Sequence, residues 1–273
     1  MSLITIDAEL CKRDGLCSAV CPFDIISLDD KDSPPQETEQ AAKLCYHCGQ
    51  CVAVCPHGAL SLQDMPVSEC IPVDPTLSVS PEQVRQMFRM RRSIRNYKDK
   101  PVESEIMEDL LRTATYAPSG HNTQPTNWMV FQGASLVRLR GLTLEFLKQL
   151  LEKMPEIAIP AHVPEVIEAT EAGHDKIFYG APTVLLCHAP IDARTAPLGC
   201  VIALAHFELA ATASGLGTCW MGYFNYASEV YPPLKEELAL PEGHKNYGAL
   251  SVGYPKFKYH RIPLRRETGI VWR

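Results

Sequence analysis

The stretch that decides the fold of the amino-terminal part is Cys45-Tyr46-His47-Cys48-Gly49-Gln50-Cys51-Val52-Ala53-Val54-Cys55-Pro56. Its spacing, C-x2-C-x2-C-x3-C-P, places three cysteines within seven residues and a fourth just beyond them. A loop this tight can direct three thiolates to one iron–sulfur cube, while the fourth cysteine, followed by proline, reaches a second cube. The motif therefore predicts a small domain built around iron–sulfur clusters.

A second run of the same pattern precedes it, from Cys11 to Pro22, with Asp14 in place of the second cysteine. In paired runs of this kind, the fourth cysteine of each run reaches the other cluster. We therefore predict two sets of metal ligands, one of four cysteines and one of three cysteines with Asp14. The first set is Cys21, Cys45, Cys48 and Cys51, and the second is Cys11, Asp14, Cys17 and Cys55.

Residues 1–62 resemble a bacterial-type two-cluster ferredoxin, which implies two 4Fe-4S clusters. Asp14 departs from that pattern, because a carboxylate binds iron less firmly than a thiolate does. Either Asp14, or a water beside it, is the fourth ligand of a cluster that can lose this iron, or Asp14 is a surface residue beside a permanent 3Fe-4S cluster. We interpret the spacer residues His47 and His57 as solvated neighbours of the ligands. Structural zinc is the alternative for the cysteines, but zinc sites use two separated cysteine pairs.

Net charge and composition exclude several classes of protein. The 273 residues carry a net charge of −6, and residues 1–80 hold 12 acidic and 4 basic side chains, which argues against a nucleic-acid partner. The chain starts without the basic and apolar segments of a secretory signal and has no run of 18 uninterrupted apolar residues. The 11 cysteines, an odd number, do not indicate a disulfide framework. We expect a cytoplasmic protein that does not enter a membrane.

Prolines divide the chain into a domain at 1–65, a linker at 66–80 and a larger domain at 81–273. The linker lacks a regular hydrophobic period, and its prolines are Pro66, Pro72 and Pro75. A helix should begin after Ser80, because proline follows it directly and Gln83 lies three residues after this cap.

Hydrophobic periodicity predicts the elements of the larger domain. The expected helices are 81–90, 103–115, 135–154 and 198–214, and the expected strands are 128–132, 183–188, 218–223 and 250–254. The alternation predicts an α+β or α/β sheet covered by helices. Residues 198–216 are apolar around nearly the whole helix, broken by His206 and Glu208, so this segment should be buried in a core or a subunit interface. We interpret His206 as a core histidine.

Four segments of the larger domain carry candidate ligand-binding residues. The first helix is followed by Arg91-Arg92-Ser93-Ile94-Arg95, whose cations and hydroxyl suit a phosphate and a polyol chain. The alternative is that these basic residues only stabilise the dipole of the helix at its carboxyl end. The other segments are Ala117–Pro125, Gly215–Gly222, and Gly253-Tyr254-Pro255 with Arg261-Ile262-Pro263. In this order, the segments resemble the FMN-dependent nitroreductase family over nearly all of 81–273.

The resemblance implies an α+β fold with a mixed sheet flanked by helices, in an intertwined homodimer with two FMN sites built from both chains. By this resemblance, the phosphate and the pyrimidine side of FMN are bound by Arg91, Ser93, Arg95 and Arg261. The other subunit supplies Pro118, Ser119 and Asn122 to the same site. The flavin ring lies along Trp220, Met221 and Gly222. Independently, an arginine near the N1–O2 edge stabilises reduced flavin. His121 is a candidate proton donor to substrate, with loop capping as the alternative.

The two parts together predict an FMN-dependent oxidoreductase that receives electrons through its iron–sulfur clusters. The donor would be an external one-electron donor such as ferredoxin, and the acceptor a flat, electron-poor molecule such as a nitroaromatic, quinone or enone. Two alternatives stay open. One is a non-catalytic electron carrier, and the other is an NAD(P)H-driven nitroreductase whose clusters are structural.

Overall fold

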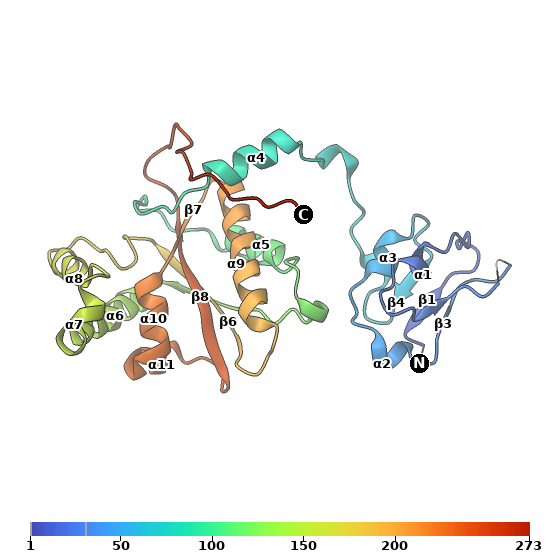
Figure 1. Ribbon diagram of the computed structural model, residues 1–273, viewed down its shortest axis with the longest axis horizontal. Coiled ribbons are helices and arrows are strands. Elements are labelled where there is room, and N and C mark those ends of the chain that lie inside the picture. The colour runs from blue at the N-terminus through green and yellow to red at the C-terminus, as the bar shows by residue number, and fades with distance from the viewer. Residues whose placement is uncertain (1, 31) are drawn as a thin grey trace. The chain divides into compact units, whose positions relative to one another are not determined.

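The structure is a computed structural model that describes residues 2–30 and 32–273 (Figure 1). The chain divides into two units, the first extending to Ser78 and the second comprising Val79–Gly120 and Gln124–Arg273, with His121–Thr123 grouped with the first. The division after Ser78 falls within the predicted linker, and the domain limits themselves stay a prediction. Each unit is described separately below.

Short elements joined by tight turns make up the first unit. They are β1 (Ile4–Ile6), α1 (Leu16–Ala19), β2 (Ile26–Ser27), β3 (Gln36–Glu37), α2 (Ala41–Leu44), α3 (Gln50–Val54) and β4 (Leu60–Leu62), followed by the 3₁₀ turns η1 (Val67–Glu69) and η2 (Pro75–Leu77). β1 pairs antiparallel with β4, and β2 pairs antiparallel with β3. The buried side chains of Ile4, Ile26, Val52 and Leu60 form the core of this unit.

Both cysteine runs use the same turn to start a helix. Gly15 and Gly49 precede α1 and α3 with φ angles of 75° and 71°, a left-handed conformation that glycine adopts without strain. A Cβ atom on Gly49 would also lie 2.7 Å from the sulfur of Met65. Each turn brings the residue at the third ligand position of its run, Cys17 or Cys51, into the first turn of the helix.

The second unit contains a four-stranded sheet between two layers of helices. Its helices are α4 (Pro81–Met90), α5 (Ser104–Ala114), α6 (Ala134–Lys153), α7 (Pro155–Ala158), α8 (Val163–Glu171), α9 (Ala196–Ala213), α10 (Gly222–Val230) and α11 (Pro232–Leu238), with a 3₁₀ turn at Gly120–Asn122. The strands are β5 (Asn127–Gln132), β6 (Thr183–Pro190), β7 (Gly217–Trp220) and β8 (His244–Gly253), in the order β5-β6-β8-β7.

The central strand β6 is buried along nearly its whole length because both sheet faces are covered. Val184 and Leu186 belong to the core shared with α6, α8, α10 and α11, whereas Leu185 and Cys187 belong to the core shared with α5 and α9. Figure 1 shows these two groups of helices on opposite sides of the sheet. This alternation is the two-residue period of a strand. It fixes which helices lie on which face.

The structure confirms the predicted start of the first helix of the second unit. α4 begins after Ser80 and ends at Met90, and its capping box is complete. The backbone N–H of Gln83 donates to the Ser80 hydroxyl at 3.2 Å, and the backbone N–H of Ser80 donates to the side-chain oxygen of Gln83 at 2.8 Å. Local sequence determines this end because every partner lies within three residues.

The predicted strand 218–223 is wrong at its carboxyl end. β7 stops at Trp220, Met221 turns the chain, and α10 begins at Gly222. The predicted strand 250–254 is too short, because β8 already begins at the polar residue His244 opposite the end of β6. All pairings between named strands are antiparallel, and the parallel component is a bridge between Ser93 and Thr218.

Helix α9, which was expected to be buried in a core or a subunit interface, is only partly buried within the described chain. By length and composition it is apolar enough to cross a membrane. One side packs on α5 and the sheet and carries the buried residues Leu204 and Phe207. The opposite side leaves Leu198 75% and Val201 42% exposed. His206 is also exposed, so the interpretation of this residue as a core histidine is wrong.

Candidate cluster cavities and flavin edge

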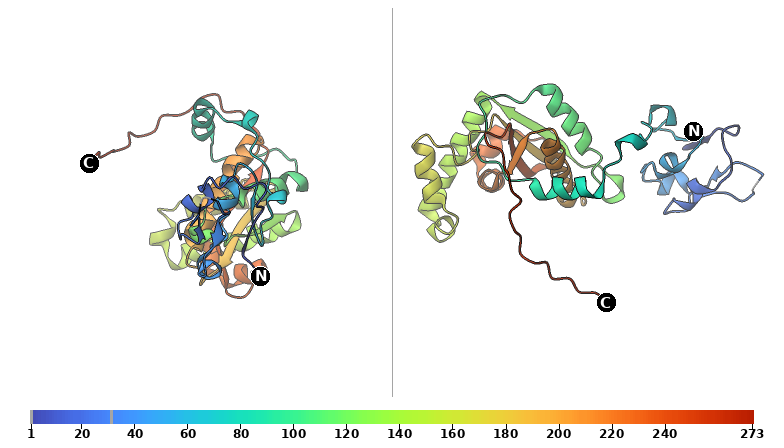
Figure 2. Two further views of the ribbon diagram at one scale, coloured as in Figure 1. Left: turned by 90° about the vertical axis from the view of Figure 1, so that its right-hand side faces the viewer. Right: turned by 90° about the horizontal axis from the view of Figure 1, so that it is seen from above.

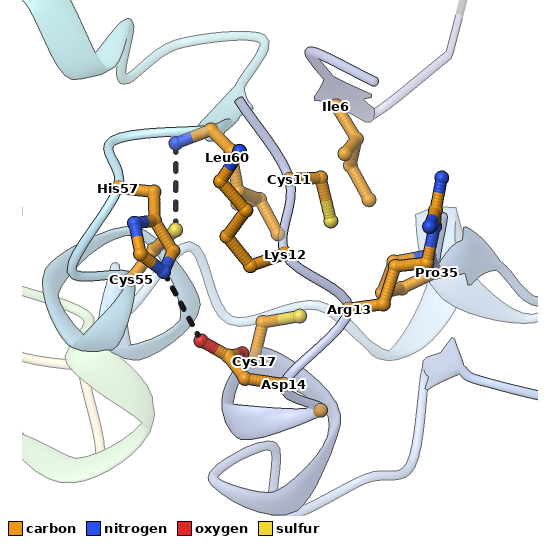
Figure 3. Close-up of a pocket in the computed structure, with 12 residues that line it drawn as sticks. Ile6, Cys11, Lys12, Arg13, Asp14, Cys17, Pro35, Cys55, His57 and Leu60 are labelled. Atoms are coloured by element: carbon orange, nitrogen blue, oxygen red, sulfur yellow. Dashed lines mark hydrogen bonds and ion pairs between the residues drawn. The ribbon is translucent and has the colours of Figure 1, made fainter. Parts of the chain in front are cut away.

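The first unit contains a cavity lined by the second predicted ligand set (Figure 3). Cys11, Asp14, Cys17 and Cys55 border about 340 Å³ of space not filled by protein atoms. Lys12, Arg13 and His57 line the same cavity together with apolar residues such as Ile6 and Leu60. The two motif runs meet here, because Cys55 comes from the second run and the other three residues come from the first.

A second cavity is lined by the other predicted ligand set: Cys21, Cys45, Cys48 and Cys51. Its remaining wall is formed mainly by apolar and aromatic side chains, including Phe23 and Tyr46. No charged residue among the described ones lines it. The two cavities therefore offer different environments, one with four thiols and an apolar wall and one with three thiols, a carboxylate and charged neighbours.

The chemistry of these cysteines fits iron–sulfur clusters. No disulfide joins any of the 11 cysteines, and burial raises the pKa of Cys51 to about 11 and also raises the pKa of Cys17 and Cys45. Metal binding requires the thiolate, so iron would supply the charge that keeps these groups deprotonated at neutral pH. Backbone N–H groups of His47 and Ala59 donate to the sulfurs of Cys45 and Cys55, both at 3.4 Å. Such hydrogen bonds stabilise cluster-bound sulfur. The assignment of individual ligands stays a prediction.

In the second unit, the segment Arg91–Arg95 lies along β7. Ser93 forms the parallel bridge to Thr218, and the backbone N–H of Ile94 donates to the Thr218 carbonyl at 2.8 Å. Gly217 permits this approach, because a Cβ atom there would lie 2.8 Å from the Cβ of Ile94. Such a distance is too short for two carbon atoms.

A buried carboxylate holds Arg91. Its Nη1 donates to Oε1 of Glu208 at 3.0 Å, and the hydroxyl of Thr218 donates to the same oxygen at 2.9 Å. Glu208 belongs to α9 and is 7% exposed, whereas the Arg91 side chain is 25% exposed. The guanidinium keeps further N–H donors for a ligand, because one of its five is engaged here.

Arg95 and Cys219 form the next layer of the same edge. The Arg95 guanidinium lies 5.7 Å from the ring centre of Tyr179, and its side chain and that of Ser93 also contact the thiol of Cys219. Burial raises the pKa of Cys219, and Arg95 opposes this shift. Cys219 is therefore a neutral packing group at physiological pH and not a nucleophile.

The three residues predicted along the flavin ring differ in what they can offer. Trp220 is 37% exposed and its indole packs over Gly248, while Met221 is 2% exposed and its side chain belongs to the core beneath α10. Any ligand contact of Met221 would therefore come from its backbone. Gly222 begins α10 and has open space around the position of a Cβ atom. Two guanidinium groups, a hydroxyl and an open glycine at a helix start fit the phosphate and ring of FMN.

The remaining predicted flavin residues lie elsewhere in the single chain. Within the described residues, no hydrogen bond or ion pair joins Pro118, Ser119 or Asn122 to the segment Arg91–Arg95. Ser119 instead accepts a hydrogen bond from the backbone N–H of Gln124 at 3.0 Å. His121 and Asn122 are in left-handed conformations, with φ angles of 54° and 52°.

Arg261 lies in an exposed carboxyl-terminal tail. Residues 256–273 form no helix or strand, and the tail extends away from the sheet of its own unit (Figure 2). The tail carries exposed apolar side chains, among them Leu264 at 98% and Trp272 at 89% exposure. Among the described residues, no hydrogen bond joins Arg261 to the segment Arg91–Arg95, so one chain alone does not assemble the whole predicted set.

Sequence reasoning missed three residues that shape this edge. Glu208 was seen only as a break in an apolar helix, and Tyr97 and Tyr179 carried no motif. The Tyr97 hydroxyl donates to the Ile94 carbonyl at 2.8 Å and meets the hydroxyl of Ser251 at 2.8 Å, which ties the arginine segment to β8. Only the charge of Glu208 within an apolar helix was a usable signal, because buried charges need partners.

Comparison with known proteins supports the reading of both units. The family model described as "4Fe-4S dicluster domain" matches residues 5–59, and the "Nitroreductase family" model matches residues 88–254, more than half of the chain. A nitrobenzene nitroreductase from Ectopseudomonas oleovorans is 26% identical over 198 residues, covering 63% of this chain and 86% of that protein. A chloronitrobenzene nitroreductase from Comamonas testosteroni is 26% identical over 225 residues, covering 69% and 96%.

A nitroreductase from Bacteroides fragilis, solved with bound FMN, shares the fold of the second unit with a TM-score of 0.56. It is 23% identical, and the match covers 70% of this chain and 99% of that one. These findings support a flavin-dependent oxidoreductase with an α+β fold and an amino-terminal iron–sulfur domain. The chain belongs to the nitroreductase family.

Proposed function

We propose that this protein is a cytoplasmic FMN-dependent oxidoreductase that takes electrons through two iron–sulfur clusters and reduces an electron-poor organic acceptor. The observation that carries the proposal is the presence, in one chain, of two cysteine-lined cavities and a nitroreductase domain with an arginine segment along β7. Bound FMN accepts electrons singly and delivers them in pairs. A relay of this kind suits a one-electron donor such as a ferredoxin.

The residues would divide the work as follows. Arg91 and Arg95 hold the anionic parts of FMN, and Glu208 keeps Arg91 in place. Gly222 leaves one side of the ring open for a flat acceptor. The nitroaromatic compounds in the names of two relatives favour a nitroaromatic over a quinone or enone.

A homodimer is the proposed working form, with FMN sites shared between two chains. Its support is the exposed apolar side of α9, with Leu198 and Val201, and the apolar tail 256–273. Burial of such surfaces is favourable by about 25 cal/mol per Å². The second chain would also supply Pro118, Ser119 and Asn122, which do not reach the arginine segment of their own chain.

Anaerobic stopped-flow reduction tests the relay. Reduced ferredoxin should bleach the FMN absorbance of the wild type, and Cys45→Ala should slow this step at least tenfold. Cys70→Ala is the matched control, because Cys70 lies in the same unit but lines neither cavity. An unchanged rate in Cys45→Ala would show that the clusters do not deliver the electrons.

Two further measurements separate the alternatives. Rapid FMN reduction by NADH or NADPH in cluster-free protein would favour a nitroreductase with structural clusters. Absence of steady-state turnover with a panel of nitroaromatics, quinones and enones would favour a non-catalytic electron carrier.

A further inference from the structure

The two cysteine runs provide an internal comparison between the cavities. At the second ligand position, Asp14 of the first run corresponds to Cys48 of the second run. Two residues after the last cysteine, Phe23 corresponds to His57. Because the last cysteines cross over, Cys48 and Phe23 line one cavity, and Asp14 and His57 line the other. Both departures from the all-cysteine pattern therefore occur in the same cavity.

In that cavity the imidazole faces the carboxylate. Nε2 of His57 lies 3.8 Å from Oδ2 of Asp14, and Figure 3 shows the two side chains directed toward each other beside Cys55. The other carboxylate oxygen, Oδ1, accepts a hydrogen bond from the backbone N–H of Leu16 at 3.2 Å. Asp14 thus accepts a backbone hydrogen bond on Oδ1 and has the Nε2 atom of His57 next to Oδ2.

Backbone turns fix the position of His57. Gly58 has a φ angle of 59°, and its N–H donates to the Cys55 carbonyl at 3.3 Å. The next N–H, from Ala59, donates to the sulfur of Cys55 at 3.4 Å. His57 lies at the centre of this turn, so its direction toward Asp14 follows from the same turn that holds the ligand Cys55.

The corresponding side chain in the other cavity is apolar. Phe23 packs edge to face on Tyr46, with ring centres 4.5 Å apart, and offers no polar atom to Cys48. The other histidine of the motifs, His47, is 2.9 Å from the carboxylate of Asp64 and lines neither cavity. An imidazole therefore stands beside the carboxylate position and not beside the thiolate position.

We propose that His57 is a positioning residue for Asp14, which holds the carboxylate at the open corner of the first cluster so that Asp14 binds the fourth iron. A carboxylate binds iron more weakly than a thiolate does, so its affinity depends more on being held in place. Partners that orient a metal ligand typically contribute about 10- to 100-fold in metal affinity. The proposal rests on the proposed function only in requiring that the first unit holds iron–sulfur clusters.

The iron exchange balances without an additional co-reactant. The reduced, neutral 3Fe-4S core takes up one Fe²⁺ at Asp14 and becomes the dicationic 4Fe-4S core. In the reverse direction an oxidant such as ferricyanide removes one electron, and one Fe²⁺ leaves the Asp14 corner. This loss leaves the oxidised, monocationic 3Fe-4S core. The oxidised 3Fe-4S core gives an EPR signal and the dicationic 4Fe-4S core does not, so the fraction of protein in each form can be counted.

The test is an Fe²⁺ titration of the full-length protein. Reconstituted wild type and variants are converted to the three-iron form with ferricyanide, reduced with dithionite and titrated anaerobically with Fe²⁺. The remaining three-iron form is measured by EPR after reoxidation of each sample by a mild oxidant. The informative variants are His57→Phe, which copies the residue of the other cavity, and His57→Gln, which keeps a polar group. His47→Gln is the matched control.

We expect His57→Phe to weaken Fe²⁺ binding 10- to 100-fold, His57→Gln to weaken it less, and His47→Gln to leave it unchanged. The double variant Asp14→Cys/His57→Phe should behave as an all-cysteine site and give no three-iron signal. Equal affinity of wild type and His57→Phe would overturn the positioning role, and so would retention of a full four-iron cluster in Asp14→Ala. Absence of any cluster in the wild type would overturn both proposals, whereas slow FMN reduction with normal Fe²⁺ titration would overturn the relay alone.

Discussion

Replacement of Glu208 by alanine should destabilise the flavin-binding unit by about 2–4 kcal/mol. Breaking a fully buried ion pair by removing one partner costs about 3–5 kcal/mol, and the 25% exposure of the Arg91 side chain lowers this figure through solvent screening. The same change leaves the Thr218 hydroxyl, which is buried, without its acceptor. Glu208→Gln keeps the volume and an acceptor oxygen, so its cost should be about 1–2 kcal/mol, the difference between charged and neutral hydrogen bonds.

Urea unfolding followed by tryptophan fluorescence measures this loss. The three tryptophans, Trp128, Trp220 and Trp272, all lie in the second unit, so the signal reports on that unit. The matched control is Glu237→Ala, which removes the 2.6 Å contact between Glu237 and Arg138 at the surface and should cost about 0–1 kcal/mol. If Glu208→Ala and Glu237→Ala cost the same, the reasoning that Glu208 is a buried anchor for Arg91 is refuted.

Three other predictions concern the same unit. Gly217→Ala should displace the Arg91–Arg95 segment from β7 and lower the FMN content of the purified protein. The control is Gly141→Ala, whose new methyl group meets open space beside α6 and should leave the FMN content unchanged. A full FMN complement in both variants would contradict the close approach of Gly217 and Ile94. Burial and the neighbouring His244 lower the pKa of His188. The unfolded state therefore binds one more proton than the folded state below about pH 6.5, and the free energy of unfolding should fall as the pH decreases. The slope is at most about 1.4 kcal/mol per pH unit. The pH dependence of urea midpoints should flatten in His188→Gln, and an equally steep dependence would assign it to other groups. Deletion of residues 256–273 should convert the proposed dimer to a monomer in light scattering and reduce FMN content, whereas a dimer of unchanged stability would show that the tail is not part of the interface.

Local signals explain why some elements were predicted to the residue. The start of α4 depends on Ser80, Pro81 and Gln83, which interact with one another over three positions. The cysteine spacings are local in the same sense, because a short loop has few ways to direct several sulfurs inward. Features of this kind are readable in a sequence without knowledge of the fold.

Other features depended on contacts between distant segments. The strand predicted at 218–223 ends at Trp220 because Met221 turns into the core beneath α10, a choice set by packing and not by the apolar pattern. Glu208 lies 117 positions from Arg91, and no periodicity could have paired them. The meeting of His57 with Asp14 likewise required the crossing of the two cysteine runs in space.

The sequence by itself determined the chemistry this protein can hold: the number and spacing of its thiols, the arginine segment after the first helix and the order of the flavin-domain motifs. These are properties of neighbouring residues, and bond geometry constrains them strongly. The tertiary structure alone decided which groups share an environment, such as Glu208 with Arg91 and His57 with Asp14. Burial and charge pairing act between segments far apart in the chain, so they exist only once the fold has brought those segments together.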